Sequence, residues 1–128
     1  MFNDWPQHAK SLSPALADLR GGTEVMKAFS TIAASAKKAG ALDMKTKELI
    51  ALAIGVAIHC DDCITFHAKA AVDLGATREE VMETLGMAIY MGAGPSVMYA
   101  AHAAEAVSQY AAAKAAADAA AEAAKQST

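Results

Sequence analysis

A run of ten apolar residues, Leu49–Ile58, constrains the fold more than any other feature of the sequence. Charged residues precede this run, and Asp43 can cap the helix that the run predicts. A helix that is apolar on every side must be surrounded by protein. The composition also favours helices, because alanine is abundant, 5% of residues are aromatic and β-branched residues are sparse. The sequence therefore predicts an all-α fold around a buried central helix.

Glycine, proline and capping residues divide the rest of the chain into further helices. Thr23 can cap one helix, Thr77 and Glu80 form a T-x-x-E capping box, and Gly75 is a candidate C′ residue. This punctuation predicts five or six helices, over residues 13–19, 23–39, 44–58, 61–74, 77–91 and from 95 onward. The third and fourth of these are expected to form a central antiparallel hairpin.

A single domain accounts for all 128 residues, since the sequence has no internal repeat and no second domain. We expect the packed core to cover about residues 15–105. Residues 111–128 form an alanine-rich tail, which favours a helix but offers little to pack against. The tail is therefore expected to fray.

Charge and hydropathy exclude several classes of protein. The net charge of −3 gives no basic surface for nucleic acid. The N-terminus carries an acid and no basic segment, unlike a secretory signal. The longest uncharged run, Thr84–Ala104, contains glycine, proline and histidine, so we interpret it as two buried helices around a turn instead of a membrane span. We expect a cytoplasmic protein that binds neither nucleic acid nor membrane.

The two cysteines, Cys60 and Cys63, have C-x-x-C spacing. In a chain without a secretory signal, this spacing indicates redox or metal chemistry more than a structural crosslink. If a helix begins near Cys60, then Cys60, Cys63 and His67 lie on one face of it. Free N–H groups and the dipole at a helix N-terminus stabilise a thiolate. One helix could thus supply a nucleophile, a resolving thiol and an acid/base group.

Glu48 joins this group by a geometric count. If residues 44–58 and 60–74 form a hairpin that turns at 58–60, then residues equidistant from the turn lie side by side. Glu48 then falls opposite positions 67–70, with its carboxylate within reach of His67. A carboxylate next to a histidine and two thiols is a plausible proton relay.

Other interpretations of these residues remain open. The cysteines could be two small buried residues without reactivity. Alternatively, His59, Cys60, Cys63 and His67 have the ligand types of a zinc site, although one continuous segment seldom wraps a tetrahedral ion. Glu48, taken alone, is a first-turn acid that interacts with the helix dipole.

Several further residues have ordinary structural explanations. Tyr99 and His102 are expected to pack in the core, and His8, Lys37 and Lys38 are expected to be solvated. The remaining group shares helical spacing and apolar character, and we interpret its members as core fillers: Met82, Met87, Met91 and Met98.

The spacing of the reactive residues resembles a known family. Glu48, Cys60-x-x-Cys63-x-x-x-His67, Gly75-Ala76, the Glu-Glu helix start and Gly92-Ala93-Gly94-Pro95 resemble the AhpD-like family over about residues 15–105. This family is the alkylhydroperoxidase branch of the carboxymuconolactone decarboxylase superfamily. The decarboxylases of that superfamily lack the cysteine pair.

The resemblance implies a thiol-dependent peroxidase. Cys63 would attack the hydroperoxide, Cys60 would resolve the sulfenic acid, and Glu48 and His67 would relay protons. A lipoyl-protein or thioredoxin-type dithiol would regenerate the pair, with no metal, haem or flavin cofactor. The best-studied members have a histidine where this chain has Asp62, and an acid there should disfavour the thiolate. The alternatives are a disulfide reductase, a redox-sensing oligomeric protein or a zinc-binding protein.

The apolar runs also predict self-association. A small core can surround Leu49–Ile58, but 128 residues can hardly also surround the uncharged stretch Thr84–Ala104. Surplus apolar surface of that size marks an interface. We expect a homo-oligomer, and the resemblance implies a trimer or a hexamer.

Overall fold

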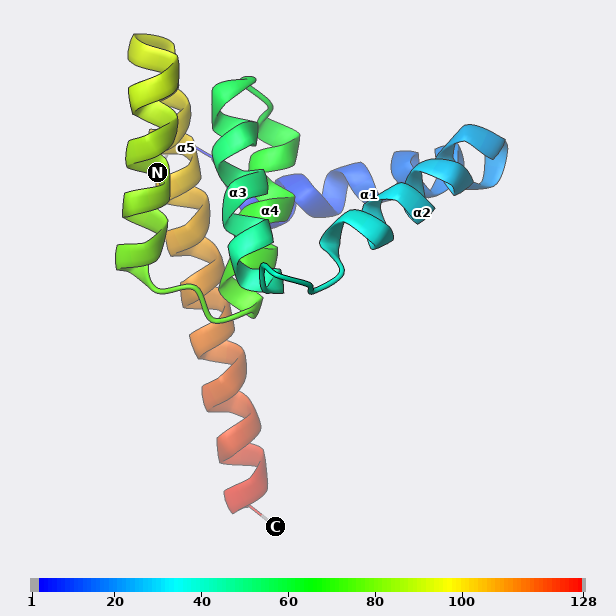
Figure 1. Cartoon of the computed structure of the whole chain (residues 1–128). Helices are drawn as coiled ribbons and strands as arrows, with labels where there is room; N and C mark the ends of the chain where they lie inside the picture. Colours follow the sequence, from blue (N-terminus) through cyan, green and yellow to red (C-terminus); the bar gives the residue numbers. More distant parts are fainter. Residues whose placement is uncertain (1–2, 128) are drawn as a thin grey trace.

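The computed structural model describes residues 3–127, which form five helices and no strand. The helices, in chain order, are α1 (Trp5–Gly22), α2 (Glu24–Lys37), α3 (Met44–Ala57), α4 (Asp61–Asp73) and α5 (Arg78–Gln126). Figure 1 shows α3 and α4 as an antiparallel hairpin beside the two arms of α5. The predicted all-α, single-domain fold with a central hairpin is confirmed.

Helix α5 reverses direction at the predicted break. Ala93 has φ 57° and ψ −147°, which lies outside the helical region. The segments before and after this residue run side by side against the hairpin (Figure 1). A Cβ at Gly92 would collide with the Ser96 hydroxyl, so the reversal requires glycine at this position.

The core lies between α3, α4 and α5 and extends further than predicted in both directions. Leu52, Val56 and Ile64 are fully buried at its centre. At its edges, Trp5 is 1% exposed and Tyr110 is also buried, so the core is not confined to residues 15–105.

Helix α1 begins near Trp5 and not at Ser13, because an earlier cap is present. The Asp4 carboxylate accepts the Gln7 N–H at 3.0 Å, and Pro6 stands in the first turn of the helix. Pro14 lies inside the helix and does not start it. The sequence analysis missed this start because it assigned the first cap to Ser13.

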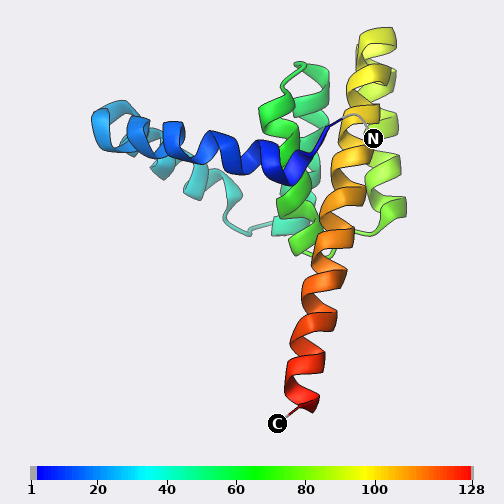
Figure 2. The same cartoon turned by 180° about the vertical axis from the view of Figure 1, so that it is seen from behind.

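Beyond its first turns, α1 extends away from the bundle and α2 returns alongside it (Figures 1 and 2). Thr23 caps α2 as predicted, with its Oγ1 accepting the Met26 N–H at 3.1 Å. The predicted apolar face of α2 is largely uncovered, since Met26 and Ala33 are half-buried whereas Phe29 and Ile32 are exposed. Within one chain, this face has little to pack against.

Helix α3 is buried along one side instead of on every side, which corrects the sequence-based prediction. Leu52 and Val56 are buried, whereas Ile50, Ile54 and Ile58 are 44–64% exposed. The four methionines interpreted as core fillers are also exposed, and that interpretation is wrong for the isolated chain: Met82, Met87, Met91 and Met98.

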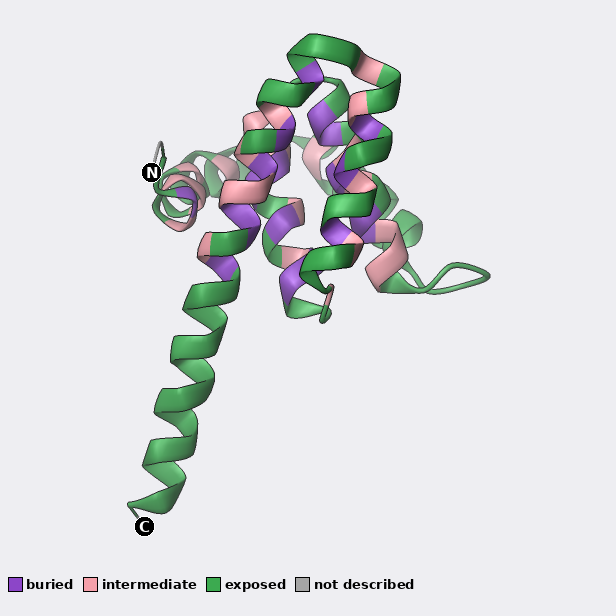
Figure 3. Cartoon of the chain, turned by 90° about the vertical axis from the view of Figure 1, so that its left-hand side faces the viewer, coloured by how far each residue is buried: buried purple, intermediate pink, exposed green. Residues whose placement is uncertain are grey.

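The alanine-rich tail continues α5 as a regular helix to Gln126, instead of fraying. Its residues from 111 to 127 are exposed, and Figure 3 shows them without any buried position. Alanine has the highest helix propensity, and Lys114 contacts Asp118 one turn later at 3.1 Å. Among the described residues, no helix is both long and apolar enough to cross a membrane.

Candidate active site

The turn between α3 and α4 is tight because it closes with two backbone hydrogen bonds. His59 N–H donates to Val56 C=O at 3.2 Å, and Cys60 N–H donates to Gly55 C=O at 2.9 Å. This is the Schellman pattern, with His59 in the left-handed conformation at φ 60°. The sequence analysis did not foresee a histidine in a position that usually holds glycine.

Cys60 leaves this turn as the N-cap residue of α4. Its backbone is extended (φ −110°, ψ 93°), and its Sγ accepts the Cys63 N–H at 3.1 Å. Cys60 and Cys63 are joined by a disulfide, with their Cα atoms 5.2 Å apart. Both residues are half-buried. The structure thus contains the oxidised form of the pair, at the end of a helix whose N–H groups favour negative charge on sulfur.

Gly55 allows the two helices to approach closely behind the disulfide. A Cβ added to Gly55 would lie 3.4 Å from the Cβ of Cys63. Glycine therefore lets α3 pack directly against the first turn of α4, and this fixes the depth at which Cys63 lies.

Glu48 and His67 are in contact across the hairpin, as the count from the turn predicts. Oε2 of Glu48 lies 2.7 Å from Nδ1 of His67. The Glu48 side chain is 7% exposed, whereas the His67 side chain is 32% exposed. A buried carboxylate requires a polar partner, which His67 provides. The contact uses Nδ1 and leaves Nε2 for a substrate or a second proton acceptor.

Two further imidazoles contact the acids between the cysteines. Nδ1 of His102 lies 2.8 Å from Asp61, and Nε2 of His8 lies 2.7 Å from Asp62. His102 comes from α5 and His8 from α1, so three helices meet at the N-terminus of α4. His8 is therefore not the purely solvated residue that the sequence analysis expected, and His102 is half-buried beside the site.

A row of rings connects the turn to α1. The ring of His59 stacks on Tyr99 at 4.5 Å, and Tyr99 lies 5.2 Å from His102. Trp5 follows at 5.7 Å from His102 and 6.1 Å from His8. Tyr99, expected to pack in the core, is half-buried and packs against the core while its ring lies between two histidines at the edge of the site.

Hydrogen bonds hold Trp5, and with it the start of α1, against the bundle. The Trp5 carbonyl accepts the Thr65 hydroxyl at 3.0 Å and the Tyr110 hydroxyl at 3.3 Å. Its indole N–H donates to Glu105 at 3.0 Å. These contacts determine where His8 meets α4.

The zinc interpretation required four residues that have other contacts here. Both sulfurs are in the disulfide, His59 stacks on Tyr99, and His67 contacts Glu48. Within residues 3–127, no group of three or more histidine, cysteine or acidic side chains could hold a metal ion.

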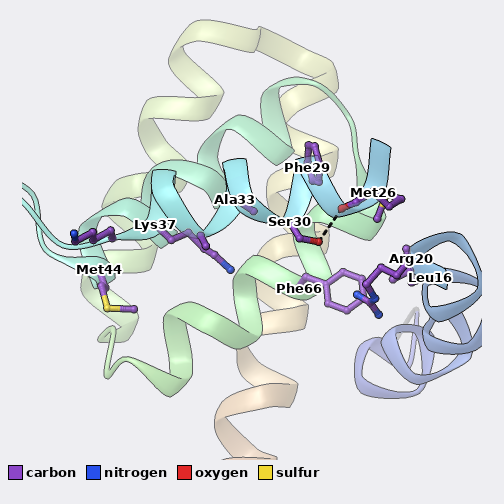
Figure 4. A pocket seen from close by; sticks show the side chains of 11 residues that line it. Leu16, Arg20, Met26, Phe29, Ser30, Ala33, Lys37, Met44 and Phe66 are labelled. Carbon is purple, nitrogen blue, oxygen red and sulfur yellow. Dashed lines mark hydrogen bonds between the residues drawn. The ribbon is translucent and has the colours of Figure 1, made fainter. Parts of the chain in front are cut away.

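A cleft of about 800 Å³ lies between α1, α2 and α4 (Figure 4). Its lining is mainly apolar, and Arg20, Lys37 and Lys38 add positive charge. Phe66 reaches it from α4, one turn beyond Cys63. The lining does not include any of the four predicted site residues, so the cleft is distinct from the disulfide and its proton-relay candidates.

The fold and this site define an all-helical protein with a disulfide-bonded C-x-x-C pair beside a carboxylate–histidine contact. The carboxymuconolactone decarboxylase family matches residues 23–106, and the chain belongs to this family. The family resemblance inferred from the spacing of Glu48, the cysteines and His67 is confirmed at this level.

Two solved structures of this family and a curated relative are similar to the chain. A carboxymuconolactone decarboxylase family protein from Legionella pneumophila is 52% identical, with a TM-score of 0.82, over 84% of this chain and 96% of that one. A family protein from Thermotoga maritima, described with a possible involvement in antioxidative response, is 28% identical with a TM-score of 0.70, over 84% and 89% of the two chains. An uncharacterized protein of Cupriavidus necator is 45% identical over 61% of this chain and 69% of its own length.

Proposed function

We propose that this protein is a cytoplasmic thiol peroxidase that reduces hydroperoxides through Cys60 and Cys63. The main support is one observation: a disulfide-bonded pair at a helix N-terminus lies on the same hairpin as the buried Glu48–His67 contact. The involvement in antioxidative response described for the Thermotoga maritima relative is consistent with this chemistry.

In the first step, the Cys63 thiolate attacks the terminal oxygen of the hydroperoxide. The O–O bond breaks, Cys63 becomes a sulfenic acid, and the alkoxide takes a proton and leaves as an alcohol. We assign delivery of this proton to His67. Glu48, 2.7 Å from Nδ1, would hold the ring in place and stabilise its protonated form.

In the second step, Cys60 attacks the sulfur of the Cys63 sulfenic acid. The S–O bond breaks, the hydroxide takes a proton to become water, and the disulfide forms. The extended backbone of Cys60 brings the two sulfurs together. The disulfide-bonded pair in this structure corresponds to the end of this step.

In the third step, an external dithiol of the lipoyl or thioredoxin type reduces the pair by two thiol–disulfide exchanges and is itself oxidised to a disulfide. The Cys60 sulfur accepts a helix N–H at 3.1 Å, which favours Cys60 as the leaving thiolate. The donor would therefore attack Cys63 first. The cycle needs no bound metal, haem or flavin.

A disulfide reductase or redox sensor is the second candidate, and the acids beside the cysteines favour it. Asp61 and Asp62 carry negative charge next to the thiol that would attack peroxide, and like charge disfavours a thiolate. Such a protein would form the reversible disulfide without turning over peroxide.

Thiol counting and sulfenic acid trapping test the proposal. One equivalent of peroxide should remove both free thiols of the reduced protein, and dithiol donors should restore them with turnover. Cys63→Ser should abolish peroxide consumption, whereas Cys60→Ser should leave a sulfenic acid that dimedone labels on Cys63. Labelling of Cys60 in Cys63→Ser, with none on Cys63 in Cys60→Ser, would reverse the two roles. A reversible disulfide with no turnover of any peroxide would favour the second candidate.

We also propose that the protein is a homo-oligomer, a trimer or a hexamer. The support is apolar surface that one chain leaves uncovered on three helices: Phe29 and Ile32 on α2, Ile50 and Ile54 on α3, and Met91 on α5. The apolar cleft beside α2 adds to this surface (Figure 4). Patches of this kind mark interfaces in stable proteins. Light scattering at micromolar concentration should exclude a 13.1 kDa monomer, and a stable monomer would contradict the proposal.

A further inference from the structure

The acids next to the cysteines are both held by histidines from other helices. Asp61 and Asp62 follow Cys60 directly in the first turn of α4. His102 contacts Asp61 from α5, and His8 contacts Asp62 from α1, at 2.8 and 2.7 Å. Neither histidine is a local neighbour in sequence, since 41 and 54 residues separate the members of the two contacts.

The charge state of these histidines sets the charge that the cysteines experience. With neutral imidazoles, Asp61 and Asp62 place two negative charges beside the sulfurs and oppose thiolate formation. With protonated imidazoles, each histidine cancels the charge of its carboxylate. The helix N-terminus can then stabilise a thiolate without opposition from the two acids. The histidines could therefore offset the effect of having Asp62 between the cysteines.

Further titratable groups lie on the elements around the two contacts. Asp4 caps the start of α1, and Glu105 lies on α5 next to the indole of Trp5. His59, in the turn before Cys60, stacks on Tyr99, which in turn contacts the His102 ring.

We propose that His8 and His102 are positioning residues that neutralise Asp62 and Asp61, and that they thereby set how readily the Cys60–Cys63 disulfide is reduced. The reaction concerned is the uptake of two electrons and one proton by the disulfide, which gives one thiol and one thiolate. This inference rests on the proposed function to the extent that the pair must be a reversible dithiol. It does not require that peroxide be the oxidant.

The proposal makes the docking of α1 part of the redox site. Trp5 anchors α1 through its contacts with Thr65, Tyr110 and Glu105, and His8 lies one turn further along the same helix. Trp5 is the single tryptophan of the chain and lies next to both histidines. Its fluorescence therefore reports whether this arrangement survives in a variant.

The test compares His8→Gln and His102→Gln with the unaltered protein, using two measurements on the cysteine pair. In redox titration with glutathione buffers, each substitution should shift the equilibrium constant toward the disulfide by about threefold to tenfold. A tenfold shift corresponds to about 30 mV in the reduction potential. The rate of thiol alkylation should fall by a similar factor, because the substitution leaves the carboxylate beside the cysteines without its partner.

A matched control lies on the same helix. Lys69 contacts Asp73 at 2.6 Å at the far end of α4, so Lys69→Gln also leaves an exposed carboxylate without its cation. This variant should change neither the redox equilibrium of the cysteine pair nor its rate of alkylation. The double variant His8→Gln with Asp62→Asn should restore the original values, because it removes both charges.

A further variant keeps the proposal testable if the histidine variants fold poorly, as judged by Trp5 fluorescence. Asp62→Asn alone should accelerate alkylation by about threefold, since it removes the negative charge and leaves the imidazole. The proposal is overturned if this variant is unchanged, if Lys69→Gln gives the same shift, or if the pair cannot be reversibly oxidised. If the shifts occur without peroxide turnover, the inference stands and the peroxidase proposal fails.

Discussion

The cysteine pair lies between two kinds of carboxylate–histidine contact that differ in their surroundings. All have similar lengths, 2.7 Å for Glu48–His67 and 2.7–2.8 Å for the contacts of Asp62 and Asp61. However, the Glu48 side chain is 7% exposed, whereas those of Asp61 and Asp62 are 41% and 59% exposed. We call Glu48–His67 the inner contact, and Asp62–His8 and Asp61–His102 the outer contacts. Charge at Glu48 is shielded from water, and charge at the outer contacts is screened by it. We therefore assign proton transfer to the inner contact and adjustment of the thiol reactivity to the outer contacts.

The largest expected effect comes from removing the anchor of the outer contacts. Trp5→Ala deletes a side chain that is 1% exposed and should lower the free energy of unfolding by about 3–5 kcal/mol, as measured by urea denaturation. It should also detach His8 from Asp62 while leaving the inner contact in place. Trp5→Phe is the control, because it keeps most of the packing and loses the hydrogen bond to Glu105. Equal stability of Trp5→Ala and the unaltered protein would show that α1 is not anchored there.

The next largest effect concerns the inner contact. Glu48→Gln is nearly isosteric but removes the buried charge that would support His67, and we expect peroxide turnover to fall by about a hundredfold. Stopped-flow measurement of Cys63 oxidation checks this expectation. Glu79→Gln, at an exposed first-turn acid of α5, is the matched control and should have no effect. A Glu48→Gln protein with normal kinetics would reduce Glu48 to a structural acid.

The two kinds of contact also differ in how far the sequence predicts them. Glu48 and His67 are 19 residues apart and joined by one tight turn, so helix geometry alone brings them together. His8 and His102 meet the acids only through the packing of α1 and α5 on α4. Their positions depend on Trp5 and on the reversal at Ala93, and a helix-by-helix reading of the sequence contains no signal for such long-range contacts.

The fold itself was predictable for a related reason. Caps such as Thr23, Asp43 and Thr77 are local signals, and each begins a helix as expected. Burial was less predictable, because it depends on all neighbours of a side chain. Ile54 and Met91 are apolar and yet 53% and 75% exposed, which is the pattern expected if further copies of the chain cover them.

A smaller effect tests the turn that sets the inner contact. Helices α3 and α4 each end in a Schellman turn, with His59 left-handed after α3 and Gly75 (φ 85°) left-handed after α4. Gly75→Ala should destabilise the protein by about 1 kcal/mol, because a Cβ is strained in this conformation. His59→Gly should stabilise it by less than about 0.5 kcal/mol, since relief of strain is offset by loss of the stack on Tyr99.

Thermal and urea unfolding of these two variants provide the measurement. His59→Ala is the control, because it loses the stack without relieving the strain and should be less stable than the unaltered protein. If His59→Gly proves clearly destabilising, the stack on Tyr99 outweighs the strain. The histidine would then be the stabilising choice at this turn.

The smallest expected effect is also the sharpest test of the difference between the inner and outer contacts. Raising the ionic strength from 0.1 to 1 M shortens the screening length from about 10 to about 3 Å. The effect of His8→Gln on thiol alkylation should then shrink to less than about twofold, because Asp62 is exposed to the added ions. The loss caused by Glu48→Gln should remain unchanged, because ions do not reach a buried carboxylate. Equal salt dependence of the two variants, measured at fixed pH, would mean that both contacts experience the same medium, and the separation into a proton-transfer contact and adjusting contacts would no longer hold.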